Sequence, residues 1–351
     1  MKTREGDLLE TCDGSVFDVK GLVHPPSRAI AFIRYFRDEK GDRKKKKNRT
    51  AYGKVYSFSE RYNLLKDRFP TYLVHDAVFD ETLCEVPDSD VKKRHDPIEK
   101  LARLKTGRNL DSLEGKALEL AEMVIQKTDI PWGAIGVSGS VLVGLHKTGS
   151  DIDPVVYGSA NCRRVYSGLQ DMLKEPQSPF KPYSLGELQS LFDFRSKDTA
   201  MGFQEFVRTE TKKAFQGKFM GTDYFVRFVK DWGEIREEYG DIQYKNVGYA
   251  KIKATIADDS ESIFTPCTYI LQKAEVVDGP KLAPIREIAS FRGRFCDQAR
   301  NGDTIIAQGK VERVTDLERN DEYFRLLIGN KPSDYMLPSW SFQTLTFRTC
   351  S

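Results

Sequence analysis

The residues best suited to chemistry lie in one short part of the chain. Gly139 and Ser140 are followed, after a spacer of ten residues, by Asp151-Ile152-Asp153. A glycine-serine turn presents backbone N–H groups to a phosphate, and glycine lets that phosphate approach closely. Two aspartates at i and i+2 of an extended segment share one face, where their oxygens can hold Mg²⁺. The stretch therefore predicts a phosphate and metal site for nucleotidyl transfer.

The segments around these residues must place the turn next to the two carboxylates. Residues 111–114 form a capping box, which predicts the start of a helix. Residues 132–137 are short and apolar, as is typical of a buried strand, and residues 141–145 are predicted as a short helix. Residues 154–157 continue the extended segment that carries the aspartates. The predicted order is strand, tight turn, short helix and strand.

The Gly-Ser turn, the spacer and the Asp-Ile-Asp triplet resemble the signature of the DNA polymerase β-type nucleotidyltransferase superfamily. This resemblance implies that Gly139 and Ser140 bind the phosphates of a nucleoside triphosphate (NTP). It also implies that Asp151 and Asp153 bind two Mg²⁺ ions, with Mn²⁺ as an alternative. We assign Ser150, which directly precedes the first aspartate, to nucleotide binding as well.

The resemblance also implies a third carboxylate on a neighbouring strand. Residues 222–230 are rich in aromatic and β-branched side chains and predict such a strand, with Asp223 and Arg227 on one face. We predict that Asp223 is the third metal ligand or the base, and that Arg227 or Lys230 neutralises phosphate charge. Asp193, in a segment that looks helical, is the second candidate. The alternative is that Asp223 only ends a turn.

Pro154 departs from the superfamily pattern, which usually has an apolar residue after the second aspartate. Proline has no N–H to donate to a sheet. The strand is therefore predicted to be peripheral, to pair on one side only at this residue, or to belong to a slightly remodelled site.

The order of predicted elements favours an α+β fold with three domains. Residues 1–95 are predicted as a strand-rich domain, and residues 96–240 as a nucleotidyltransferase core with a mixed sheet and helices. Residues 241–351 contain several short strands separated by turns, which predicts a small β-barrel. This layout resembles a group of archaeal chains described only as nucleotidyltransferase-domain proteins.

The basic residues are clustered although the formal net charge is only +3. Residues 43–49 hold six cations within seven positions, and a second basic stretch runs from Lys92 to Arg108. Such runs can bind the phosphates of RNA or DNA, or they can be solvated loops and linkers. With the two strand-rich domains, they favour a nucleic-acid acceptor.

Composition excludes several other classes of protein. The six cysteines include no Cys-x-x-Cys pair, which argues against a zinc site and a disulfide framework. No run approaches the ~18–20 apolar residues of a membrane helix. The first residues do not look like a signal peptide, so we expect a cytoplasmic protein with no membrane partner.

These patterns predict an enzyme that transfers a nucleoside monophosphate from an NTP to an acceptor hydroxyl and releases pyrophosphate. The acceptor is predicted to be RNA or DNA. One alternative is a non-catalytic nucleic-acid-binding protein with a degenerate nucleotidyltransferase fold. Another is a transferase that acts on a small molecule or a protein. The base, the acceptor and the oligomeric state stay open.

Overall fold

The computed structural model describes residues 1–45, 49–196, 200–280 and 284–338. Part of the predicted basic run at 43–49 therefore lies outside the described residues. The chain forms two compact units, and the predicted boundary between residues 95 and 96 falls inside the first. The first unit contains Met1–His75, Thr82–Pro182 and Ala214–Tyr239, and the second contains Asp76–Glu81, Tyr183–Lys213 and the chain from Gly240 onward.

The N-terminal part of the first unit is an eight-stranded sheet. Six of its strands follow the order β4-β5-β3-β2-β1-β8, while β7 also pairs with β3, and β6 pairs with β7. Its neighbours are mostly antiparallel, as expected for strands joined by short turns. The strands are β1 (Leu8–Thr11), β2 (Val16–Val19), β3 (Arg28–Arg37), β4 (Arg43–Lys44), β5 (Ala51–Lys54), β6 (Leu73–Asp76), β7 (Glu81–Pro87) and β8 (Val91–His95).

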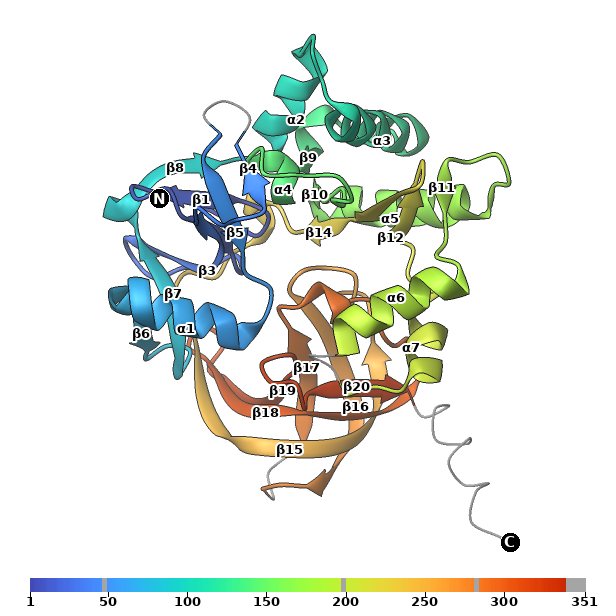
Figure 1. Cartoon of the computed structure of the whole chain (residues 1–351). Coiled ribbons are helices and arrows are strands. Elements are labelled where there is room, and N and C mark those ends of the chain that lie inside the picture. Colours follow the sequence, from blue (N-terminus) through green and yellow to red (C-terminus); the bar gives the residue numbers. More distant parts are fainter. Residues whose placement is uncertain (46–48, 197–199, 281–283, 339–351) are drawn as a thin grey trace, which may run out of the picture. The chain divides into compact units, whose positions relative to one another are not determined.

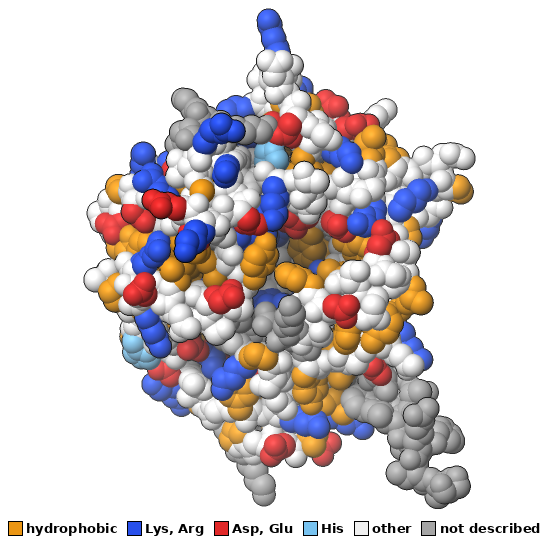
Figure 2. All heavy atoms as spheres, in the orientation of Figure 1, with side chains coloured by type: hydrophobic (Ala, Val, Ile, Leu, Met, Phe, Trp, Pro, Cys, Tyr) orange, Lys and Arg blue, Asp and Glu red, His pale blue; other side chains and the backbone are white. Residues whose placement is uncertain are grey.

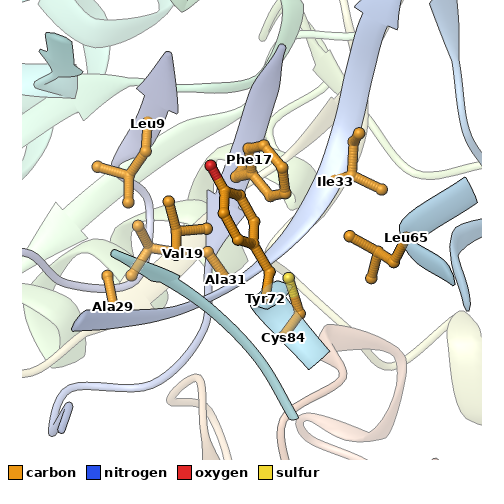
Figure 3. Packing of buried hydrophobic residues seen from close by; sticks show 10 residues of the cluster. Leu9, Phe17, Val19, Ala29, Ala31, Ile33, Leu65, Tyr72 and Cys84 are labelled. Carbon is orange, nitrogen blue, oxygen red and sulfur yellow. The ribbon is translucent and has the colours of Figure 1, made fainter. Parts of the chain in front are cut away.

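One face of this sheet is an apolar core. Figure 3 shows Phe17 and Ile33 from the strands facing Tyr72 and Leu65, and all four side chains are buried. Leu65 comes from α1 (Phe58–Arg68), which begins at a capping box of Ser57 and Glu60. Burial of one such aliphatic or aromatic side chain stabilises a fold by about 1.5–3 kcal/mol. The core therefore holds the N-terminal sheet in a fixed shape, which leaves its other face available for function.

A three-stranded sheet forms the centre of the first unit (Figure 1). Its middle strand is β10, which pairs antiparallel with β9 and parallel with β14. Helix α3 begins at the predicted capping box of Asp111 and Glu114, so that prediction is confirmed. The strands are β9 (Ile135–Val137), β10 (Pro154–Tyr157) and β14 (Arg227–Val229), and the helices are α2 (Pro97–Thr106), α3 (Ser112–Thr128), α4 (Gly139–Leu142) and α5 (Ser159–Lys174).

The strand predicted at residues 222–230 is two strands. A second three-stranded sheet holds β11 (Phe180–Lys181), β12 (Gln216–Phe219) and β13 (Thr222–Phe225), and β14 begins after Val226. Val226 donates its N–H to Phe215 O at 2.7 Å, so at this residue the chain turns away from β10. In register this break lies opposite Pro154, which pairs with Val137 of β9 on its other side. Pro154 thus lies on the middle strand of this sheet. Its missing N–H leaves no gap in the hydrogen bonding, because at this residue the strand pairs with β9 and not with β14.

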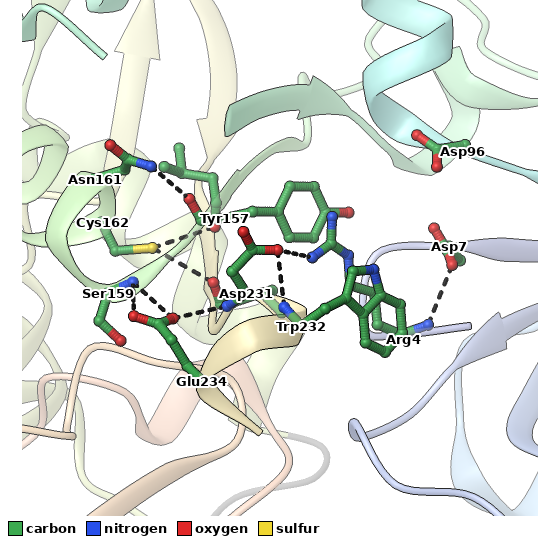
Figure 4. A network of polar contacts seen from close by, with 12 residues as sticks. Arg4, Asp7, Asp96, Tyr157, Ser159, Asn161, Cys162, Asp231, Trp232 and Glu234 are labelled. Atoms are coloured by element: carbon green, nitrogen blue, oxygen red, sulfur yellow. Dashed lines mark hydrogen bonds and ion pairs between the residues drawn. The ribbon is translucent and has the colours of Figure 1, made fainter. Parts of the chain in front are cut away.

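The N-terminal segment is attached to the C-terminal ends of β10 and β14. Arg4 Nη1 donates to Asp231 Oδ1 at 2.8 Å, and its guanidinium lies 3.6 Å from the Tyr157 ring centre and 4.9 Å from that of Trp232 (Figure 4). A cation over an aromatic face is attracted by the ring quadrupole. These contacts fix the N-terminal sheet relative to the central sheet of the same unit.

The described residues of the second unit form two α-helices and a six-stranded sheet. Strand β15 pairs with both β16 and β18, and β17 pairs in parallel with β19, so the pairings lead from β15 through β16, β17, β19 and β18 back to β15. The elements are α6 (Leu185–Arg195), α7 (Phe203–Glu210), β15 (Ile242–Asp258), β16 (Cys267–Asp278), β17 (Ile285–Ser290), β18 (Thr304–Asp316), β19 (Asp321–Leu327) and β20 (Tyr335–Pro338).

The predicted α+β class is confirmed by these mixed sheets and helices. No helix within the described ranges is long and apolar enough to cross a membrane. On the face shown in Figure 2, Lys and Arg side chains are interspersed with Asp and Glu. Short 3-10 helices occur at Pro70–Tyr72, Asp88–Asp90, Trp132–Ala134, Trp232–Glu234 and Gly293–Phe295.

Candidate metal and nucleotide site

The Gly-Ser turn is held in place from two sides. Ser138, the last residue before the turn, donates its N–H to Asp153 O at 2.8 Å. Its hydroxyl donates to Gly6 O at 2.6 Å, and this bond is buried. The turn is therefore fixed both to the strand that carries the aspartates and to the N-terminal segment.

Gly139 lies directly against the carboxylate of Asp153. A Cβ atom at this position would be 1.7 Å from Asp153 Oδ2, and the φ angle of Gly139 is +60°. Only glycine accepts both the contact and this left-handed backbone without strain. The predicted turn and the predicted carboxylate pair thus lie together, and their contact explains why glycine is needed there.

The carboxylates of Asp151 and Asp153 lie on one face of the chain, because Ile152 between them is fully buried on the other. No residue in the described part of the chain donates a hydrogen bond to either carboxylate. Burial and the neighbouring charge of Asp151 together raise the pKa of Asp153 to about 7. Two adjacent carboxylates without donors form a suitable site for a divalent cation.

The hydroxyl of Ser140 is buried and has no hydrogen-bond partner among the described residues. A buried hydroxyl without a partner costs free energy, so such groups usually have a ligand or a water to bind. Ser140 Oγ belongs to the turn that contacts Asp153. It is therefore placed to bind an oxygen atom of a ligand in this site.

Asp223 lies on the strand next to the aspartates. Ile152 donates its N–H to Asp223 O at 2.9 Å and accepts the N–H of Phe225 at 3.0 Å. This parallel bridge aligns Ile152 with Tyr224, and both of these side chains are buried. Alternation then places Asp223 on the same face as the two aspartates, beside Asp151. Its carboxylate accepts a hydrogen bond from Lys218 Nζ at 3.0 Å.

The three predicted metal ligands do not form a closed group. Among the residues that the structure describes, the possible metal ligands whose atoms all lie within 4.8 Å of one another are Asp111, Glu114 and His146. The two acids of that cluster cap α3, and His146 Nε2 lies 2.7 Å from Asp111 Oδ2. The capping role accounts for the two acids. The carboxylates of Asp151, Asp153 and Asp223 lie on one face, but their oxygen atoms are not all as close to one another as those of that cluster.

The other predicted phosphate ligands have protein partners. Arg227 Nη1 lies 3.0 Å from Glu5 Oε1 and 3.6 Å from Asp18 Oδ1, so its charge is matched. Ser150 Oγ accepts the N–H of Lys147 at 3.0 Å. Lys230 follows β14, at the far end of this strand from the aspartates. The second candidate for the third carboxylate, Asp193, lies on α6 in the second unit.

Two cations beside the aspartates are not predicted by any sequence pattern. Arg34 of β3 and Lys54 of β5 are charge neighbours of both Asp151 and Asp153. Burial and the charge of Arg34 lower the pKa of Lys54 to about 8, although the two carboxylates oppose this change. The sequence carried one signal, an arginine inside the apolar strand 29–36. Nothing in the spacing showed that it faces residues more than a hundred positions away.

The raised pKa of Asp153 predicts that Asp153→Asn stabilises the protein in the absence of metal. In the unfolded chain this carboxyl ionises near its ordinary pKa of 3.8, whereas in the folded protein it keeps its proton until about pH 7. The charged group therefore costs stability that grows from about pH 4 and is fully present above about pH 7. Each pKa unit corresponds to about 1.4 kcal/mol, so the expected gain near pH 8 is a few kcal/mol.

Urea unfolding in EDTA, at about pH 8 and about pH 4, measures this effect. The gain in the free energy of unfolding should disappear at the lower pH. Asp67→Asn, at an exposed position, is the control and should leave the free energy of unfolding unchanged at both pH values. A lower stability of Asp153→Asn at both values would contradict the assignment of a costly buried charge.

Comparison with known proteins finds one relative that covers nearly the whole chain. It is the protein named "Uncharacterized protein MJ1086" of Methanocaldococcus jannaschii, which is 32% identical over 336 residues. The match spans 94% of this chain and 96% of the relative. No protein-family model matches the chain, and neither does any solved structure.

Proposed function

We propose that this chain, which belongs to the same family as the Methanocaldococcus jannaschii protein MJ1086, is a metal-dependent nucleotidyltransferase. The observation that carries the proposal is the contact between Gly139 and the carboxylate of Asp153. It brings a phosphate-binding type of turn against a pair of carboxylates without hydrogen-bond donors. The buried hydroxyl of Ser140, which has no partner among the described residues, supports the same conclusion.

Each group has a role in this reaction. Asp151 and Asp153 would hold Mg²⁺, with Asp223 on the same face as the third ligand or as the base. The bound ions would neutralise phosphate charge and orient the attacking and leaving oxygens. A bond forms between the acceptor oxygen and the α-phosphorus, and the bond from that phosphorus to pyrophosphate breaks. The proton of the acceptor hydroxyl passes to a base, for which Asp223 is our candidate.

The second unit supports a nucleic acid as the acceptor. We assign its closed cycle of five pairings, with β17 parallel to β19, to the small β-barrels. Five-stranded barrels of this kind often bind oligonucleotides. This part of the proposal rests on a likeness of fold, so RNA or DNA is the acceptor class to test first.

The direct test is incorporation of label from each of the four NTPs, labelled at the α-phosphate, into RNA and DNA oligonucleotides. We expect incorporation with Mg²⁺ or Mn²⁺, release of pyrophosphate and no product in EDTA. Absence of product with every NTP and acceptor, together with salt-sensitive oligonucleotide binding, would favour the non-catalytic alternative. Pyrophosphate release that needs a small molecule or a protein instead would identify the other acceptor class.

A further inference from the structure

We infer that the N-terminal sheet supplies part of the nucleotide site, with Arg34 and Lys54 as ligands of the triphosphate. The inference rests on the proposed function and extends it, because it assigns substrate binding to a part of the chain without a catalytic motif. It concerns binding and not the chemical step. It can therefore be tested without knowing the base or the acceptor.

The placement of the two cations follows from the sheet. Strand β3 pairs with β5 so that Tyr35 is opposite Lys54, and side chains paired in this way lie on the same face of the sheet. The register of β3 on β2 shifts between Ile33 and Tyr35, so Arg34 is the extra residue of a β-bulge. Tyr35 pairs with Val16, and Asp18, two residues along β2, shares the face of Val16. Asp18 contacts Arg227 of the central sheet. This face of the N-terminal sheet is thus directed at the central sheet that carries the aspartates.

Other contacts fix the N-terminal strands against the Gly-Ser turn. Tyr35 and Tyr52 are buried in one cluster with Leu142, at the end of α4. Arg43 Nη1 donates to Leu145 O at 2.8 Å, a buried bond between β4 and the segment after α4. The strands that carry Arg34 and Lys54 are therefore packed onto the turn, so the two cations have a defined position beside the site.

Neither cation has an ionic partner. Within the described part of the chain, the Arg34 guanidinium and the Lys54 ammonium make no hydrogen bond and no ion pair. Burial lowers the pKa of Arg34. The nearby Tyr35 and the charges of Asp18, Asp153 and Asp151 outweigh this effect and raise the pKa above its usual value. Nearby Arg227, by contrast, lies within ion-pair distance of Glu5 and Asp18. Cations with a purely structural role would be expected to pair in the same way.

The four groups, which have no hydrogen bond or ion pair within the described residues, together match an NTP with its metal ions. The two carboxylates can bind divalent cations, while the two basic side chains can bind phosphate oxygens by charge-assisted hydrogen bonds. An NTP with four negative charges and two Mg²⁺ ions is neutral as a whole, so its binding leaves the charge balance of the site unchanged. Neither an anion alone nor a metal ion alone would satisfy all four side chains.

Binding of inorganic tripolyphosphate with Mg²⁺, measured by calorimetry, tests the inference because it needs no base and no acceptor. We expect Arg34→Met and Lys54→Met each to weaken binding by ~10- to 100-fold, the size of a charged hydrogen bond. Arg34→Lys should recover part of the loss. Matched controls are Arg37→Met, an exposed residue of the same strand, and Lys66→Met, exposed on α1, which should leave binding unchanged.

The outcomes separate the inference from the proposed function. If the wild-type protein binds Mg²⁺ and tripolyphosphate and the two Met variants bind equally well, the N-terminal sheet has no part in phosphate binding and the inference is wrong. If the wild-type protein binds no polyphosphate at any Mg²⁺ concentration, the proposed function fails as well. Thermal unfolding of each variant reports on folding. A loss of binding in a variant that melts like the wild type supports the inference.

Discussion

Replacing Asp151 or Asp153 with Asn is expected to reduce nucleotide transfer by about 1,000-fold, the upper range for removal of a group that stabilises transition-state charge. Asn has almost the same shape, so the contact with Gly139 remains. It lacks the negative charge that a divalent cation requires, so the metal-bound state is lost. The measurement is the rate of label incorporation from NTP at saturating Mg²⁺, with circular dichroism to check the fold.

Asp223→Asn extends this experiment to the third carboxylate. If Asp223 completes the site, its variant should lose activity to a similar extent; if it only ends a turn, activity should stay near that of the wild type. Thr222→Val, at the neighbouring position and on the other face of β13, is the matched control. Full activity in either Asp151→Asn or Asp153→Asn would refute the metal assignment.

Gly139→Ala is expected to abolish activity through a single methyl group. The new Cβ would lie 1.7 Å from Asp153 Oδ2 and 2.6 Å from its Cγ, so the carboxylate must move. Displacement of this ligand should remove metal binding, and transfer should fall to the level of Asp153→Asn. The left-handed backbone adds a cost in stability of about 1–2 kcal/mol.

Gly144→Ala separates the contact from the backbone effect. Gly144 has a φ angle of +67°, close to that of Gly139, but nothing lies within 4 Å of a Cβ at this position. Both variants should lose similar stability in urea, whereas only Gly139→Ala should lose Mg²⁺-dependent activity. Equal activity losses in the two variants would mean that strain, and not the contact with Asp153, explains the need for glycine.

The part of the site that the sequence could predict is the part encoded locally. The Gly-Ser turn, the two aspartates and the capping box of α3 each depend on residues close together in the chain, and the structure contains all three. The face of Asp223 followed from strand alternation, because a period of two survives even where the strand is interrupted at Val226. The role of Asp223 as a metal ligand stays a prediction.

The rest of the site depends on which surfaces pack together. Arg34 looks like any charged residue of a half-exposed strand until β3 is placed against the central sheet. Arg227 illustrates the opposite case, since its proximity to Asp223 in sequence predicted a phosphate ligand, whereas Glu5 and Asp18 lie within ion-pair distance of it. Both partners come from the first residues of the chain, and no local pattern connects them to position 227.

The bond between Arg4 and Asp231, which joins residues 227 positions apart, has a consequence for synthesis of the protein. A growing chain that ends before β14 holds its two site aspartates directly before β10, without the parallel neighbour of that strand. The residues of the second unit between Tyr183 and Lys213 must also be made before β12, β13 and β14 emerge. Contacts this distant in sequence slow folding. The ribosome therefore completes most of the polypeptide before the first unit can close, and activity should arise late and all at once.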